Sequence, residues 1–178
     1  RLMDQCPHIS LVGEAADRLA EKLGLEIVAP EWFVTRLRLG DLDEFRTSGG
    51  RLTGEPAGAP GTGTVGCVAF DQEGHLAAAT STGGRCGKWS GRQGDSSVVG
   101  AGTYAQDGVA AVSCTGFGEE FIRHGIARML CARIELAGED LADAADHMVL
   151  RVLSPGDGGL VAVDSKGAVA MPFTTEVM

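Results

Sequence analysis

A stretch rich in glycine and proline divides this chain and limits what it can fold into. Of the eighteen residues from Arg46 to Gly63, twelve are Gly, Pro, Ser or Thr, and Leu52 is the one large apolar residue among them. Such a segment cannot bury enough apolar surface to offset its ordering entropy. The sequence therefore predicts a flexible linker over 46–63, with folded segments before and after it.

The residues before the linker have helical patterns. One helix is expected over 13–23, where Gly24 is a suitable C-terminal stop, and a second helix is expected to start near Pro30. The apolar stripe of the second helix would consist of Trp32, Phe33, Leu37 and Leu39.

The residues after the linker read as strands, then helices, then strands. Strands are expected over 65–70, 76–80 and 109–114, helices near 118–136 and 139–152, and a closing hairpin of 160–163 with 168–171. Because strands and helices come in separate groups rather than in alternation, this order predicts a layered α+β sandwich.

Composition narrows the class of protein. The chain has 24 acidic and 15 basic residues and a net charge of −9, which disfavours nucleic acid as a partner. No apolar run approaches the roughly 20 residues that span a bilayer, and no signal peptide is recognisable, so no membrane partner is expected. Five cysteines without C-x-x-C spacing indicate neither a disulfide framework nor a zinc site and favour the cytoplasm. Cys67 and Cys114, in apolar strand runs, are expected to be core residues.

One match to a nucleotide-binding pattern is rejected. Gly61, Gly63 and Gly66 fit the G-x-G-x-x-G fingerprint. That fingerprint needs a strand before it and a helix after it, so that a pyrophosphate meets the helix N-terminus. Here a linker precedes the pattern and a strand follows it, so no dinucleotide site is predicted.

The junction between Gly63 and Thr64 has a chemical interpretation besides a structural one. If this bond were cut, Thr64 would carry both a hydroxyl nucleophile and a free α-amine, whose pKa near 7.7–8.0 suits a general base. Taken alone, the junction favours the simpler interpretation, an ordinary loop-to-strand boundary. Other segments decide between the two interpretations.

Four clusters of glycine, hydroxyl and charged residues follow one another along the chain. They are Gly-Thr-Val-Gly at 63–66, Thr-Ser-Thr-Gly-Gly at 80–84, Gly-Arg-Gln-Gly-Asp at 91–95 and Ser-Cys-Thr-Gly-Phe-Gly-Glu at 113–119. This succession resembles the plant-type asparaginase and isoaspartyl peptidase family of N-terminal nucleophile hydrolases, over essentially the whole chain. The resemblance implies a four-layer αββα sandwich, of which the N-terminal part is expected to be absent from this sequence. It also implies self-cleavage into 1–63, the end of an α subunit, and 64–178, a β subunit, which together form one domain.

The resemblance implies a catalytic role for each hydroxyl cluster. Thr64 would attack the substrate amide as nucleophile, and Thr82 would pack against it and tune it through a hydrogen bond. Thr115 and the N–H of Gly116 would form the oxyanion hole. Two alternatives stay open from the residues themselves: Thr82 as a turn hydroxyl, and the segment at Thr115 and Gly116 as a phosphate site.

Arg92, Asp95 and Gly118 correspond to the family's substrate-binding residues. A guanidinium suits the substrate's α-carboxylate, a carboxylate suits its α-ammonium group, and Gly118 would add a backbone carbonyl. The implied substrates are the small molecules L-asparagine and isoaspartyl dipeptides, and the implied assembly is a homo-oligomer of αβ units. The alternative for Arg92 and Asp95 is an exposed surface ion pair.

The main departure from the family is the N-terminal segment that relatives carry before the region matching Arg1. The chain begins with Arg1, so we expect an upstream segment, which in relatives supplies an oxyanion-side Asn and a sodium-binding loop; this chain contains no Asn. No cofactor is expected for the residues present. Phe117 stands where relatives often have a smaller or polar residue. Two other functions stay open: an inactive or truncated relative that retains the fold, and a glycosylasparaginase-like hydrolase, although that group usually has Asn at the position of Gly83.

Overall fold

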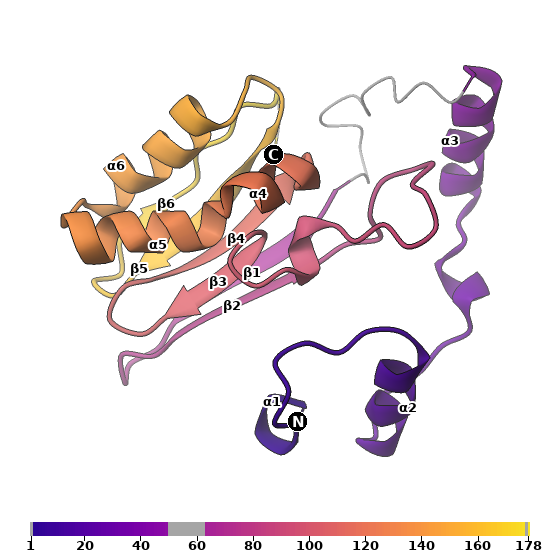
Figure 1. The fold of residues 1–178 in the computed structure, drawn as a ribbon, viewed down its shortest axis with the longest axis horizontal. Helices are drawn as coiled ribbons and strands as arrows, with labels where there is room; N and C mark the ends of the chain where they lie inside the picture. The colour runs from indigo at the N-terminus through magenta and orange to yellow at the C-terminus, as the bar shows by residue number, and fades with distance from the viewer. Residues whose placement is uncertain (1, 50–62, 177) are drawn as a thin grey trace.

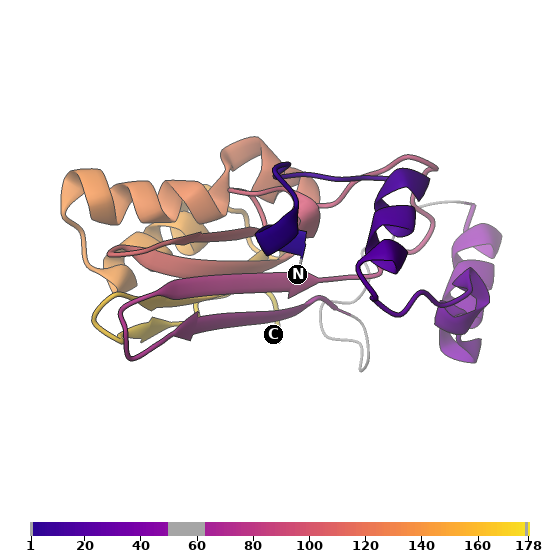
Figure 2. The same cartoon turned by 90° about the horizontal axis from the view of Figure 1, so that it is seen from below.

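Two antiparallel sheets stacked on each other form the frame of the molecule. The computed structural model describes residues 2–49, 63–176 and 178. Helices cover one face of the larger sheet, and the smaller sheet packs on its other face (Figures 1 and 2). The α+β sandwich expected from the sequence is therefore confirmed.

The smaller sheet is a hairpin, and the larger sheet has the order β3-β4-β5-β6. The hairpin pairs β1 (Val65–Phe70) with β2 (Leu76–Ser81) in antiparallel register. The strands of the larger sheet are β3 (Thr103–Gln106), β4 (Ala110–Gly116), β5 (Gly158–Asp164) and β6 (Val169–Ala170). β5 and β6 form the closing hairpin predicted from the sequence.

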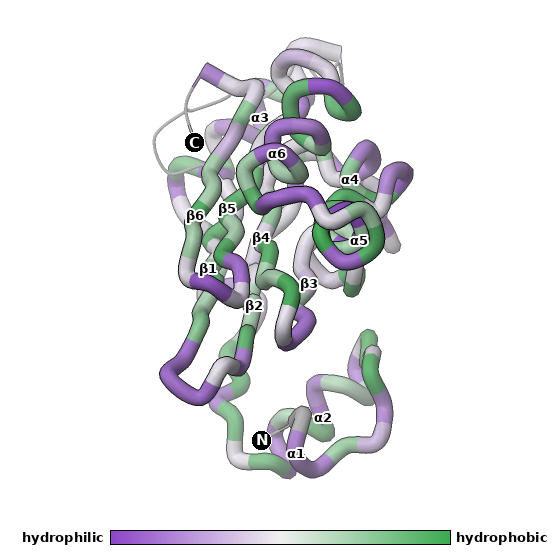
Figure 3. Tube along the Cα trace, turned by 90° about the vertical axis from the view of Figure 1, so that its left-hand side faces the viewer, coloured by the Kyte–Doolittle hydropathy of each residue, from purple (hydrophilic) through white to green (hydrophobic). Residues whose placement is uncertain are grey.

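The two sides of β4 face different layers, because successive side chains of a strand point to opposite faces. Ala110, Val112 and Cys114 belong to the larger core cluster, together with helix residues such as Phe121. Ala111 packs instead with Leu76 of β2 and Val163 of β5, between the sheets. β4 is therefore buried on both faces, and hydrophobic colouring follows the strands of the sandwich (Figure 3).

The helical layer differs from the prediction at one point. It consists of α4 (Gly118–His124), α5 (Ile126–Ala137), α6 (Leu141–Asp146) and a π-helical turn, η3 (His147–Val152). The single helix predicted near 118–136 is wrong, because Gly125 has a left-handed φ of 57° that ends α4 and starts α5. The helix predicted over 139–152 corresponds to α6 and η3.

The N-terminal helices lie beside the sandwich rather than over a face of it (Figures 1 and 3). They are α1 (Leu2–Gln5), α2 (Glu14–Lys22), η1 (Pro30–Phe33) and α3 (Arg36–Thr47). The helix predicted from Pro30 is wrong in its start: the chain makes one 3₁₀ turn, becomes extended at Val34, and begins α3 after Thr35, whose hydroxyl accepts from the N–H of Arg38. Trp32 is 71% exposed, so the expected apolar stripe is not buried in this chain.

Two further sequence expectations concern the region around β1. Cys67 is exposed, so its assignment to the core is wrong, whereas Cys114 is buried as expected. The reason is the strand period: Val68 faces the larger sheet, and its neighbour Cys67 therefore points to the opposite face. Most of the predicted linker, residues 50–62, lies outside the described residues, and α3 extends to Thr47.

Candidate active site

The register of β1 and β2 brings two of the predicted hydroxyls to one end of the small sheet. Val65 pairs with Ser81 in the last step of the ladder, so Thr64 and Thr82 occupy the next opposed positions beyond it. Thr64 is half-buried, and Thr82 is exposed. The Thr82 Oγ1 accepts a hydrogen bond from the N–H of Gly84 at 3.0 Å, which holds the start of the following loop.

The two sheets meet through a small polar contact two residues further in. Thr80 Oγ1 lies 2.7 Å from Ser113 Oγ and donates to the Gly102 carbonyl at 3.2 Å. A Cβ added to Gly66 would overlap Ser113 Oγ, so β1, β2 and β4 all approach one another here. This contact fixes how the ends of the two sheets align.

The third predicted hydroxyl, Thr115, follows from the same alignment. Leu76 and Ala111 meet at one end of the sheet interface and Thr80 meets Ser113 nearer the other, so β2 and β4 run in the same direction. Since side chains on one face recur every second residue, Thr115 occupies the β4 position that faces the small sheet. The fold therefore brings the positions of Thr64, Thr82 and Thr115, separated in sequence, to the same end of the sandwich.

Gly116 closes β4 beside Thr115. Its partner in the ladder is Gly158 of β5, and the next residue, Phe117, donates its N–H to the Asp157 carbonyl at 2.6 Å. A Cβ on Gly116 would overlap the same carbonyl. The chain then turns directly into α4 at Gly118.

Asp95 is a buried carboxylate next to this end of β4. It opens the short 3₁₀ turn η2 (Asp95–Ser97) and is 6% exposed. A Cβ on Gly118 would lie 2.6 Å from Asp95 Oδ1, and one on Gly102 would lie 2.6 Å from Asp95 Oδ2, so the two glycines leave room for the carboxylate. Within the described residues Oδ2 has no hydrogen-bond partner.

Burial has an electrostatic effect on this group. Desolvation raises the pKa of Asp95, and the neighbouring backbone N–H groups and the charge of Arg92 oppose that rise. A buried carboxylate with one free oxygen has the chemistry to accept from an ammonium group. The alternative interpretation of Asp95 as part of an exposed surface pair does not match this burial.

Arg92 has a partner that the sequence analysis did not assign. Its Nε donates to Glu119 Oε1 at 2.8 Å and its Nη2 to Glu119 Oε2 at 3.0 Å, while only 16% of the Arg92 side chain is exposed. This two-pronged bond raises the pKa of Arg92 and lowers that of Glu119. Glu119 ends the 113–119 cluster, directly after the predicted substrate-binding residue Gly118. That adjacency was the one signal in the sequence that Glu119 lies near the candidate site.

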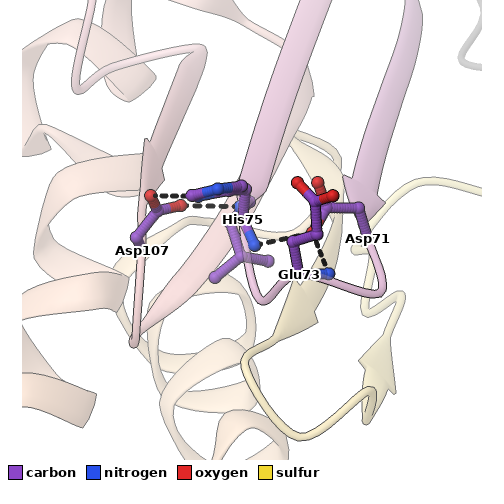
Figure 4. A network of polar contacts seen from close by, with 5 residues as sticks. Asp71, Glu73, His75 and Asp107 are labelled. Atoms are coloured by element: carbon purple, nitrogen blue, oxygen red, sulfur yellow. Dashed lines mark hydrogen bonds and ion pairs between the residues drawn. The ribbon is translucent and has the colours of Figure 1, made fainter.

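The described structure holds no competing metal centre. Among residues 2–49, 63–176 and 178, no group of three His, Cys, Asp or Glu side chains is arranged to hold a metal ion. His75 lies on the turn at the opposite end of the β1–β2 hairpin, where its Nδ1 is 3.0 Å from Asp107 Oδ2 (Figure 4). Over all the residues that the structure describes, no helix has the length and apolar character to cross a bilayer.

Comparison with known proteins identifies the family. A family model described as Asparaginase matches residues 1–178. The isoaspartyl peptidase of Escherichia coli (strain K12) is 46% identical over 184 residues, covering 99% of this chain and 57% of the relative. A probable isoaspartyl peptidase/L-asparaginase 2 of Arabidopsis thaliana is 38% identical over 199 residues, covering 99% of this chain and 61% of the relative. The isoaspartyl peptidase/L-asparaginase of Mus musculus is 36% identical over 182 residues, covering 99% and 54%.

The architecture and the comparisons agree. Stacked antiparallel sheets with a helical layer, and hydroxyl positions gathered at one end, define a sandwich of the N-terminal nucleophile hydrolase type. The chain belongs to the asparaginase family whose model it matches along its whole length. It spans less than two thirds of the length of these relatives.

Proposed function

We propose that the protein is a self-cleaving amidohydrolase that hydrolyses isoaspartyl dipeptides and L-asparagine through Thr64. The observation that carries the proposal is the convergence of the positions of Thr64, Thr82 and Thr115 at one end of the sandwich. The names of the relatives, isoaspartyl peptidase and L-asparaginase, support the same chemistry.

The first step is cleavage of the chain itself. Thr64 Oγ attacks the Gly63 carbonyl and displaces the Thr64 nitrogen, which forms an ester and frees the α-amine; water then hydrolyses the ester and leaves Gly63 with a carboxylate. Gly63 is exposed and has a φ of +147°, a conformation that L side chains rarely adopt. Residues 1–63 and 64–178 would become the two subunit fragments of one domain.

The freed Thr64 then acts on substrate. Its α-amine takes the proton of the Oγ as the hydroxyl attacks the amide carbonyl, and the leaving amine departs to give an acyl-enzyme that water opens. Thr115 and the Gly116 N–H would stabilise the oxyanion, and Thr82 would hold the nucleophile. The Asp95 carboxylate would accept the substrate ammonium, with Gly118 beside it, and Arg92 would bind the substrate α-carboxylate.

Intact mass and product release test this proposal. We expect the purified protein to yield a new N-terminus beginning Thr-Val-Gly-Cys, and Thr64→Ala to abolish both cleavage and turnover of β-Asp-Leu. Thr64→Ser keeps the oxygen and should retain slow cleavage, because only the orienting methyl is lost. The matched control is Thr47→Ala at the end of α3, where the hydroxyl donates to the local Glu44 carbonyl and has no other partner among the described residues.

Two outcomes would contradict the proposal. Turnover by Thr64→Ala at the wild-type rate would remove Thr64 as nucleophile. A single uncleaved band with no release of aspartate from either substrate would favour an inactive relative that retains the fold. The oligomer of cleaved units and the cytoplasmic location stay predictions, which size measurement and cell fractionation would check.

A further inference from the structure

An arginine lies beside the candidate oxyanion hole without a role in the proposed chemistry. The loop that follows Thr82 places the Arg85 guanidinium carbon 4.6 Å from the centre of the Phe117 ring. Phe117 is the residue next to Gly116, and it is 37% exposed. Arg85 is therefore held over the ring at the edge of the candidate site. The ring belongs to the residue after Gly116, and Thr115 is the residue before it.

Arg85 forms no ion pair among the described residues, although its charge contributes to the lowered pKa of Glu119. Among the described residues, no carboxylate forms an ion pair with Arg85 or with Lys88 of the same loop, whose Nζ donates to the Gly83 carbonyl at 2.8 Å. The acidic group that the charge of Arg85 acts on is Glu119, whose two oxygens both bind Arg92. The loop after Thr82 thus offers two unpaired cations to this end of a chain whose net charge is −9.

The stacking on Phe117 also orients the guanidinium group. A cation over an aromatic face is attracted by the ring, and the N–H donors of the guanidinium point outward in its own plane. Those donors match the two oxygens of a carboxylate. Arg85, held over Phe117 one residue beyond Gly116, can therefore offer two N–H donors to a carboxylate at this edge of the candidate site.

We propose that Arg85, held over Phe117, binds the C-terminal carboxylate of the leaving residue and so directs the site toward isoaspartyl dipeptides rather than L-asparagine. In an isoaspartyl dipeptide this carboxylate carbon is three bonds from the scissile carbonyl carbon, roughly 3–4 Å away. That length is comparable to the single Cα step of about 3.8 Å from Gly116 to Phe117. L-asparagine releases ammonia and has no such group. The inference rests on the proposed function.

Three substrates measure this preference in the purified protein: β-Asp-Leu, its C-terminal amide, and L-asparagine. We expect wild type to have a kcat/KM for β-Asp-Leu about tenfold above that for the amide, which is the lower end of what a hydrogen bond to a charged group contributes. Arg85→Gln should bring this ratio close to one, and Arg85→Lys should keep part of it. Phe117→Leu should also lower the ratio, because the apolar bulk stays but the aromatic face is lost.

The matched control replaces a nearby arginine that is exposed and already forms an ion pair. Arg123 on α4 is exposed and pairs with Glu120 at 3.3 Å, so Arg123→Gln should leave the acid-to-amide ratio at the wild-type value. Salt gives a readout that needs no variant. In wild type, the ratio of kcat/KM for β-Asp-Leu to that for its amide should fall toward one as ionic strength rises, because salt screens the charge of Arg85 at the edge of the site.

The outcomes separate the two proposals. Equal rates on β-Asp-Leu and its amide in wild type, or an unchanged ratio in a folded Arg85→Gln, would overturn the carboxylate site and leave the proposed function standing. If Arg85→Gln does not fold, the wild-type ratio and its salt dependence decide the question. No release from any of the three substrates would overturn the proposed function and this inference with it.

Discussion

Asp95 offers a prediction in which stability and activity move in opposite directions. The change is Asp95→Asn, which keeps the shape of the side chain and removes its charge. In the free protein the Asp95 carboxylate is 6% exposed, and its Oδ2 has no hydrogen-bond partner among the described residues. An unsatisfied buried polar group costs about 1–3 kcal/mol, and the nearby charge of Arg92 offsets part of that cost. We expect the variant to be about 1–2 kcal/mol more stable than wild type at pH 7.

The sign of the pH dependence follows from the raised pKa. Because burial raises the pKa of Asp95 in the folded state, the folded protein holds this proton more tightly than the unfolded chain. The contribution of the group is therefore most favourable below its unfolded-state pKa, and it is lost as the pH rises through the folded-state pKa. The advantage of Asp95→Asn should be full at neutral pH and should disappear in acid.

Urea unfolding from acid to neutral pH, combined with β-Asp-Leu kinetics, measures both effects. A gain of this size corresponds to a rise in melting temperature of roughly 2–8 °C for a chain of this length. The variant should also bind substrate poorly, with a raised KM, because the proposed acceptor for the substrate ammonium group has lost its charge. Asp146→Asn, at an exposed helix position, is the matched control and should change stability by less than about 0.5 kcal/mol. A less stable Asp95→Asn at pH 7, or a gain that does not vary with pH, would refute this reasoning.

Two further predictions concern the frame that holds the site. Gly66→Ala should destabilise the protein by about 1–3 kcal/mol in thermal unfolding, because the added Cβ would overlap Ser113 Oγ. Adding Ser113→Ala to this variant should recover part of the lost stability. If no stability is recovered, the clash does not involve Ser113. The hydrogen bond that His75 donates to the Asp107 carboxylate raises the pKa of His75, so the stability that this pair contributes should be present below the unfolded-state pKa of His75 and lost as pH rises through the folded-state pKa. Asp107→Asn should flatten the dependence of melting temperature on pH in this range, and a profile identical to that of wild type would show that the pair contributes nothing.

Much of the sandwich could be predicted from local patterns. β1, β2, β4 and the β5–β6 hairpin follow from short apolar runs bounded by turn residues, since strand formation depends on the side-chain period and the turns. The predicted roles of Thr64, Thr82 and Thr115 come from the resemblance of their motifs to those of the family, and the strand period places these hydroxyls at strand ends. Local patterns failed at Gly125, where one glycine divided a predicted helix, and at Trp32, where an apolar residue did not imply burial.

The sequence by itself indicated the candidate site residues, through motifs that resemble those of the family, and the strand ends at which they stand, because motif and period are local properties of the chain. Only the tertiary structure decided which charges meet. Arg92 pairs with Glu119 across 27 positions, and Arg85 lies over Phe117, contacts that no spacing rule predicts. The physical reason is that such partners are chosen by how the sheet ends, the Gly-rich loop and α4 pack together. The same packing buries the Asp95 carboxylate between Gly102 and Gly118, and so turns a loop aspartate into a buried acceptor beside the candidate nucleophile's end of the sandwich.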